Sequence, residues 1–260
     1  MLRFLKKLYV NAILLFLYAP IFILMIFSFN ASKSRGTWGG FSLKWYEELF
    51  KSGDIMQALY YTIIVAILST IISTALGTFA AIGISEKRGI WKKVLLNLNY
   101  LPVVNPDIVT AVSLMALYSM MRLKLGFITI LLSHIVFSTP YVVLSVLPKL
   151  KSLDPNLAEA ALDLGATPFY ALRKVIIPEI MPGIITGALL SFTLSIDDFV
   201  ISFFNTGNGV TNLSIEIFAM ARRGVKPTIN ALSTLMFLTM MVLLIIIYKR
   251  DEGGKKLENE

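Results

Sequence analysis

An apolar segment of this sequence carries an acidic, hydroxyl-rich run that is well suited to handling a charged solute. The segment reads GIITGALLSFTLSIDDFVISFF. In a continuous helix four of its polar residues are spaced by four, three and four, which places them on one face; they are Ser191, Ser195, Asp198 and Ser202. The adjacent acid, Asp197, lies about 100° away around such a helix. The two carboxylates therefore cannot both point in the same direction.

A hydroxyl stripe with one carboxylate fits the passage of a cation through a helix bundle. Acids inside a membrane are costly and usually mark a pathway, an ion pair or a packed interior. The Asp198 carboxylate would replace part of the hydration that an ammonium group loses on entry. Two structural alternatives stay open for Asp198: a hydrogen bond to a neighbouring span, or an ion pair with an arginine of a partner subunit.

Two further ionisable residues fall within apolar segments. Asp107 follows Asn105 and Pro106, which is the order of an N-cap, a first-turn proline and a first-turn acid. Asp107 therefore starts a helix, and it either joins the pathway or offsets the positive helix end. His134 is the single histidine of the chain, and we expect it to pack and form hydrogen bonds rather than relay protons.

The sequence offers no catalytic residues and no metal ligands. It has no cysteine, which excludes disulfides and thiolate chemistry. It also lacks the H-E-x-x-H and G-x-S-x-G patterns of metalloproteases and hydrolases, and the G-x-x-x-x-G-K-[ST] pattern of nucleotide-binding loops. We expect a chain that is not an enzyme and binds no cofactor of its own.

Composition identifies an all-α integral membrane protein. Of the 260 residues 56% are hydrophobic and 15% are charged, whereas soluble domains average about 25% charged residues. A spanning helix needs about 20 mostly apolar residues. The sequence predicts one transmembrane domain over residues 1–260 with six spans, at 8–29, 58–85, 94–121, 127–147, 183–204 and 228–248.

The distribution of Lys and Arg predicts the orientation of these spans. Most of the 24 Lys and Arg residues lie in the two termini and in the connections near 87–93 and 148–182. Positive charge favours the cytoplasmic side, so both termini and the 148–182 connection are expected in the cytoplasm. The net charge of +8 is then a topology signal. Because no nucleic-acid recognition motif accompanies it, we expect no nucleic-acid partner.

Two connections on the opposite side contain helix-like patterns. Ser42–Phe50 predicts a short amphipathic helix, which either rests at the lipid interface or receives a docking partner. The segment 205–227 begins with turn residues and continues with apolar residues before Arg222. It is either a second interfacial helix or part of an external gate.

The connection 148–182 is polar and predicts two short helices. Asp154 and Pro155 are typical of a helix start, and Thr167 with Pro168 repeats that signal. Gly165 stands where the first helix would close in a left-handed conformation. We expect the second helix to stop before Pro178.

This connection resembles the EAA loop of ABC importer permeases, in which EAA is followed by Gly and then by an apolar I-x-L-P pattern. The matching residues are Glu159, Ala160, Ala161, Gly165, Val175, Ile177 and Pro178. The resemblance implies a coupling helix that docks on a cytoplasmic ATPase. The residues it assigns to ATPase coupling are Glu159, Ala160, Ala161, Asp163, Gly165, Ala166 and Pro178.

Nearly the whole chain resembles the permease subunits of spermidine/putrescine importers, through NPDIVTAVSL, LGFITILLSHIVFSTPYVV and LSFTLSIDDFVISFFNTG. That resemblance implies the six-span type I ABC importer permease (MetI-like) fold in a bacterial inner membrane. It also implies a PotB-like second permease as heterodimer partner, two PotA-like ATPase subunits that use ATP and Mg, and an external PotD-like polyamine-binding protein. Asp197 and Asp198 would suit a polycationic substrate.

Three alternatives compete with a polyamine permease. A permease for another small solute would share much of the apolar scaffold. A secondary transporter or channel working alone predicts two similar halves or more charged spans, and the sequence shows no clear internal repeat. A membrane-embedded enzyme would need a nucleophile with its base, or metal ligands, and the sequence supplies neither.

Overall fold

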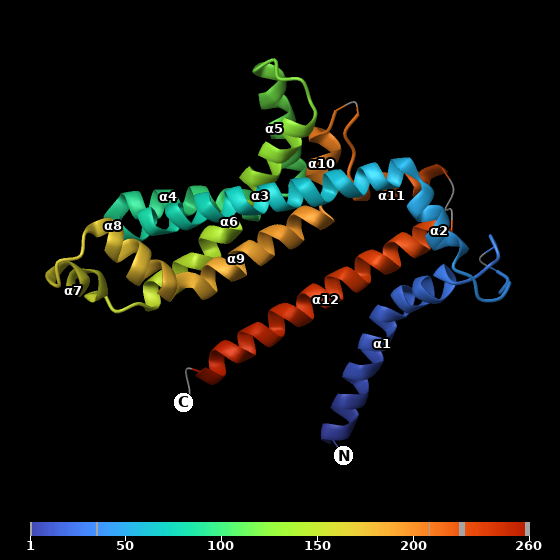
Figure 1. Cartoon of the computed structure of the whole chain (residues 1–260), viewed down its shortest axis with the longest axis horizontal. Helices are drawn as coiled ribbons and strands as arrows, with labels where there is room; N and C mark the ends of the chain where they lie inside the picture. Colours follow the sequence, from blue (N-terminus) through green and yellow to red (C-terminus); the bar gives the residue numbers. More distant parts are fainter. Residues whose placement is uncertain (1, 35, 208, 224–226, 258–260) are drawn as a thin grey trace. The chain divides into compact units, whose positions relative to one another are not determined.

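The computed structural model describes residues 2–34, 36–207, 209–223 and 227–257. The regular secondary structure in these ranges is helical; they contain one isolated β-bridge, between Asn30 and Phe41, and no β-strand (Figure 1). Its contacts divide the chain into two compact units. One unit is Gln57–Ile215, and the other combines Met1–Met56 with Glu216–Glu260.

The unit formed by the two ends of the chain contains α1 (Leu2–Ser28), α2 (Lys44–Lys51) and α12 (Thr228–Leu257). α12 contacts both α1 and α2. The short helix expected over Ser42–Phe50 is confirmed as α2. Its apolar face buries Trp45 and Leu49, and the Trp45 indole N–H donates to the Asn30 carbonyl at 2.6 Å. The described part of the segment 205–227, which leaves out residues 208 and 224–226, contains the helix α11 (Leu213–Arg223).

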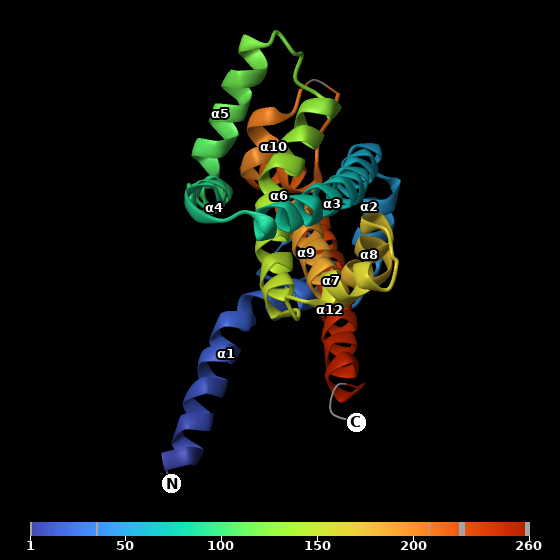
Figure 2. The same ribbon diagram turned by 90° about the vertical axis from the view of Figure 1, so that its left-hand side faces the viewer.

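The central unit is built around α6 (Phe127–Ser152), which contacts α4, α5, α9 and α10 (Figure 2). α3 (Gly53–Glu86) and α9 (Ile177–Asp197) lie against the second half of α6, with α4 (Gly89–Val104). The core there joins buried apolar side chains of α3, α6 and α9: Ala81, Ile84, Val142, Val143, Val146, Leu147 and Ile180. Burial of these side chains fixes α6 as the frame on which the other spans rest.

Glycines allow α3 and α9 to approach α6 closely. A Cβ added at Gly77 of α3 would lie 2.6 Å from the Val142 Cβ, and one at Gly187 of α9 would lie 3.0 Å from the Val142 Cα. Real Cβ atoms do not come as near as the first of these distances. Val142 is therefore packed between α3 and α9. At Gly77 and Gly187, which face it, there is no room for a larger side chain.

The third predicted span is broken in the middle. α4 ends at Val104, α5 (Asp107–Met120) begins three residues later, and the two helices meet at an angle of 105°. Asn105 and Pro106 between them have extended backbones, and proline lacks the N–H that a continuing helix would need. The predicted span 94–121 is therefore made of two helices, and the helix start at Asp107 within it is confirmed. That the pair forms one span stays a prediction.

The 148–182 connection contains two short helices, as expected, but the second does not stop before Pro178. α7 (Leu157–Asp163) is followed by α8 (Pro168–Ala171), a π-helical turn η1 (Leu172–Ile176) and α9, without interruption. The wider π turn changes the hydrogen-bond register, so the missing proline N–H falls at the start of α9 and breaks nothing. The fifth apolar helix thus reaches back to Pro168.

In the part of the chain that the structure describes, four helices are long and apolar enough to cross a membrane, or five if the bent α4–α5 pair forms one span. The described part of α12 adds a shorter apolar stretch, Thr228–Val242. The all-α membrane architecture is confirmed. The count of six spans stays a prediction.

Candidate functional site

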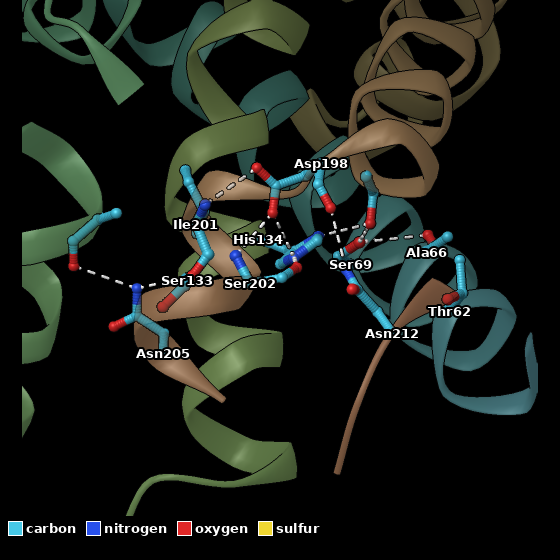
Figure 3. A network of polar contacts seen from close by, with 12 residues as sticks. Thr62, Ala66, Ser69, Ser133, His134, Asp198, Ile201, Ser202, Asn205 and Asn212 are labelled. Carbon is cyan, nitrogen blue, oxygen red and sulfur yellow. Dashed lines mark hydrogen bonds and ion pairs between the residues drawn. The ribbon is translucent and has the colours of Figure 1, made fainter. Parts of the chain in front are cut away.

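The fifth predicted span breaks at Asp198. α9 ends at Asp197, Asp198 has an extended backbone with ψ 126°, and α10 (Val200–Asn205) starts two residues later. The Asp198 carboxylate accepts the backbone N–H groups of Ile201 at 3.1 Å and Ser202 at 2.7 Å (Figure 3). These N–H groups belong to the first turn of α10, where no helical carbonyl is available to them. Asp198 therefore ends one helix and caps the next.

His134 lies beside this break and contacts residues on both sides of it (Figure 3). Its Nδ1 is 2.7 Å from the Ser195 hydroxyl in α9, and its Nε2 is 2.9 Å from the Ser202 hydroxyl in α10. Nε2 also lies 3.5 Å from Oδ2 of Asp198. Both side chains are buried, with exposed fractions of 2% for His134 and 7% for Asp198. The expectation that His134 forms hydrogen bonds is confirmed.

The predicted serines join α9 to the neighbouring helix α3. The Ser69 hydroxyl donates to Ser195 at 3.2 Å, and the hydroxyls of Ser73 and Ser191 are 2.8 Å apart. Ser191, Ser195 and Ser202 are all buried inside the central unit. A single continuous helical stripe through Asp198 is therefore wrong, because the carboxylate caps α10 instead of standing on the face of one helix. The hydroxyls of α3 and α9 bond to one another, and the His134 imidazole of α6 bonds to Ser195 and Ser202.

Asp197 and Asp107 differ from Asp198 because both are exposed. Asp197 is the last residue of α9, and Asp107 is the first residue of α5. Each acid therefore stands at a helix break, free of hydrogen bonds to the described residues. The structure does not bring Asp107 into the polar cluster around His134.

The two broken spans are packed together through their second halves. The Asn205 amide of α10 donates to the Ala111 carbonyl of α5 at 3.2 Å, and the Thr129 hydroxyl of α6 lies 2.8 Å from the Asn205 carbonyl, to which it donates. Ala111, Phe137 and Ile201 form a small buried cluster between these helices. The break at Asp198 is thus embedded in a packed assembly of α5, α6 and α10.

Asn212 and Thr62 secure the chain after α10. The Asn212 side chain donates to the Asp198 carbonyl at 3.0 Å and accepts the Ile215 N–H at 2.9 Å, which caps α11. The Thr62 hydroxyl of α3 accepts the Leu213 N–H at 2.8 Å. Ser69, Ser73, Asn205 and Asn212 were not predicted from the sequence as parts of this site. One signal was present: Ser69 and Ser73 are spaced by four residues, as are Ser191 and Ser195.

The α7–α8 segment is a compact exposed knob. Gly165 has φ +85°, which confirms the left-handed closure. The Gly165 N–H donates to the Leu162 carbonyl at 2.9 Å and the Ala166 N–H to the Ala161 carbonyl at 3.1 Å, the pair of bonds that defines a Schellman motif. Thr167 caps α8 by accepting the Tyr170 N–H at 3.3 Å.

The predicted coupling residues lie on or beside this knob. Glu159, Ala160, Asp163, Gly165 and Pro178 are exposed, and Ala161 and Ala166 are half-buried. Two large apolar side chains stand out on the same surface, with exposed fractions of 90% for Leu164 and 70% for Phe169. Apolar side chains displayed on a rigid turn are typical of a protein-docking surface.

Comparison with known proteins gives consistent results. The family model described as "Binding-protein-dependent transport system inner membrane component" matches residues 73–250. The chain is 39% identical over 243 residues to the spermidine/putrescine transport system permease protein PotC of Escherichia coli (strain K12), covering 94% of this chain and 92% of that protein. It is 40% identical over 229 residues to the putrescine transport system permease protein PotI of the same organism, covering 85% and 81%.

The fold also matches a solved transporter. A chain of a bacterial ABC transporter involved in the import of the acidic polysaccharide alginate superposes with a TM-score of 0.73 at 17% identity, covering 98% of this chain and 95% of that one. At this identity the match concerns the fold alone. It agrees with the expected architecture of ABC importer permeases.

Proposed function

Because the chain belongs to the family of binding-protein-dependent transport system inner membrane components, we propose that it is the permease subunit of an ATP-driven importer that passes polyamines into the cytoplasm. The observation that carries the substrate class is the 37–40% identity to permeases named for spermidine/putrescine and putrescine transport. The exposed acids at the two helix breaks support it.

The chemistry of the substrate matches these acids. A polyamine carries two to four ammonium groups spaced along a flexible chain, so its passage is helped by carboxylates placed one after another. Asp197 and Asp107 each expose a carboxylate at a break in a span. We assign the pathway contacts to these two acids. Asp198, Ser191, Ser195 and Ser202 stabilise the helices that carry the pathway, because their polar atoms form hydrogen bonds within the protein.

The α7–α8 knob is assigned to ATPase coupling. Leu164 and Phe169 supply apolar contacts, and Glu159 and Asp163 supply charge beside them. Gly165 and the Thr167 cap hold the two short helices at a fixed angle. A stiff connection between the docking surface and α9 transmits movement, because η1 and α9 continue directly from α8 without a flexible linker.

We further propose the partners and the orientation of this chain. A PotB-like permease completes the pathway, two PotA-like ATPase subunits bind ATP and Mg and dock on the knobs, and a PotD-like protein delivers the polyamine from outside. Both termini and the knob lie in the cytoplasm, as the Lys and Arg distribution predicts. This chain then contributes transport and coupling but no hydrolysis.

Reconstitution tests the proposal. The chain, its permease partner and the ATPase are assembled in proteoliposomes with the binding protein, and ATP-driven accumulation of labelled spermidine is measured. We expect spermidine and putrescine, but not a neutral sugar or an acidic oligosaccharide, to be taken up and to stimulate ATP hydrolysis. Uptake of a different solute class with no response to polyamines would overturn the substrate assignment and leave the family assignment intact.

A further inference from the structure

We propose that His134 is the positioning residue that decides which of the two adjacent carboxylates faces the substrate. Its imidazole holds Asp198 inside the break between α9 and α10, and Asp197 is left exposed at the end of α9. The meaning of this choice for transport rests on the proposed function. The positioning itself is a property of this chain and can be measured without any substrate.

The helix break is what separates the two acids. In an unbroken helix the Asp197 and Asp198 side chains would point in directions about 100° apart. They would lie at nearly the same height along the helix axis. Here Asp198 leaves the helix, with ψ 126°, and turns its carboxylate back onto the N–H groups of Ile201 and Ser202. Asp197 keeps its helical position and stays exposed.

The imidazole bridges this break with both of its nitrogens. Because a carboxylate only accepts, we place the proton on Nε2, which then donates to Ser202 at 2.9 Å and lies 3.5 Å from the Asp198 carboxylate. Nδ1 then accepts from the Ser195 hydroxyl at 2.7 Å. The Ser195 oxygen in turn accepts from Ser69 at 3.2 Å. Both ring nitrogens thus have hydrogen-bond partners, one on each side of the break.

Because the His134 and Asp198 side chains are buried, their polar contacts determine where the Asp198 carboxylate can lie. The His134 ring and the Asp198 carboxylate are almost completely removed from solvent, and a buried charge without partners is strongly disfavoured. The two backbone N–H groups bond one to each carboxylate oxygen, and the imidazole Nε2 lies beside Oδ2. Without the ring, a continuous helix with Asp198 turned outward becomes a competing arrangement.

A packing role for His134 makes a different prediction. If the ring only fills space, an apolar side chain of similar size preserves the arrangement of the two acids. If the ring positions Asp198, glutamine preserves it better than leucine, because the glutamine amide can still donate where Nε2 stands. Asparagine is too short to reach Ser202 and should behave like leucine.

Thiol labelling can distinguish these roles because the chain has no cysteine of its own. Asp197→Cys and Ile201→Cys are made separately in the assembled complex, and each is labelled with a cationic, water-soluble methanethiosulfonate. Ile201 is fully buried, so it reports the protected side of the break. The measured quantity is the ratio of the labelling rate at position 197 to that at position 201, with His134, His134→Gln, His134→Asn or His134→Leu.

With His134 present we expect the exposed position 197 to label at least about tenfold faster than the buried position 201, which corresponds to about 1.4 kcal/mol in the free energy of exposing the thiol. The ratio should stay within about twofold in His134→Gln. It should fall about fivefold or more in His134→Leu, the factor that corresponds to one lost hydrogen bond. An unchanged ratio in His134→Leu, or a ratio near one with His134 in place, would overturn the proposal. If the leucine variant does not assemble, the asparagine variant decides by the same criterion.

Polyamine uptake by the unmodified complex, set beside the labelling ratios of the His134 variants, separates this inference from the proposed function. A changed labelling ratio without polyamine uptake in the unmodified complex would refute the substrate assignment and keep the positioning role. Polyamine uptake with a labelling ratio that no His134 variant alters would keep the substrate and refute the positioning role.

Discussion

Asp197 and Asp198 are consecutive residues that face different surroundings. The Asp198 carboxylate is 7% exposed and accepts two backbone N–H groups of α10, whereas Asp197 ends α9 as an exposed acid. An acid already occupied by two strong donors is poorly placed to receive an ammonium group. We therefore propose that, within this subunit, Asp197 contacts the substrate and Asp198 maintains the structure.

Replacing Asp197 should impair transport without harming assembly. Asp197→Asn removes one carboxylate–ammonium contact, and we expect spermidine uptake to fall about tenfold, the size of one charge-assisted hydrogen bond. Initial uptake rates over a range of spermidine concentrations provide the measurement. Since Asp197 is exposed, the yield of purified complex should stay unchanged. Uptake equal to that of the unmodified complex would remove Asp197 from the pathway.

Replacing Asp198 should mainly reduce stability. Asp198→Ala removes the cap of α10 and the acceptor beside His134, and the loss of a helix cap costs about 1 kcal/mol. Thermal unfolding in detergent should show a lower midpoint for this variant than for Asp197→Ala, which is its matched control. The opposite order of midpoints would contradict the assignment of the two acids.

The turn at Gly165 should be sensitive to side-chain type. At φ +85° a β-branched residue is strained, whereas asparagine is tolerated in this region. We expect Gly165→Val to reduce substrate-stimulated ATP hydrolysis severalfold, because about 1–2 kcal/mol of strain would disturb the angle between α7 and α8. Gly165→Asn is the control and should retain most of the activity. Full coupling in the valine variant would show that this turn does not transmit the signal.

Two glycines of α3 offer a paired test of helix packing. A Cβ at Gly77 would meet Val142 at 2.6 Å, whereas one at Gly83 meets nothing within 4 Å. Gly77→Ala should destabilise by about 1–3 kcal/mol through overpacking. Gly83→Ala should be neutral or stabilising, because alanine favours a helix over glycine by about 1 kcal/mol. Unfolding of the two variants under identical conditions gives the comparison, and equal stabilities would exclude close packing at Val142.

Features that depend on neighbouring residues could be predicted from the sequence. The left-handed Gly165, the cap at Thr167 and the helix start at Asp107 each follow from a few adjacent residues. The apolar runs that become α3, α6 and α9 were recognisable because their length and composition suffice to indicate a buried or membrane helix. For these features local chemistry and tertiary structure favour the same conformation.

The break at Asp198 could not be predicted in the same way. Residues 191–202 satisfy the spacing of an amphipathic helix, and neither proline nor glycine interrupts them. The break is formed because the Asp198 carboxylate caps α10 and His134 lies against that carboxylate. His134 belongs to α6 and precedes Asp198 by 64 residues in the sequence. At Pro178 a helix end was predicted where none occurs. Proline usually ends a helix, but here the π turn before it lets the helix continue.

The most direct test of the central claim is uptake of labelled spermidine and putrescine in the native host with this gene deleted and then restored. We predict that deletion abolishes ATP-dependent uptake, that the unmodified gene restores it, and that the Asp197→Asn gene restores about a tenth of it, in keeping with one lost charged contact. Unchanged uptake after deletion, in a host without a second polyamine importer, would contradict the proposed substrate. The chain would then be a permease for another solute.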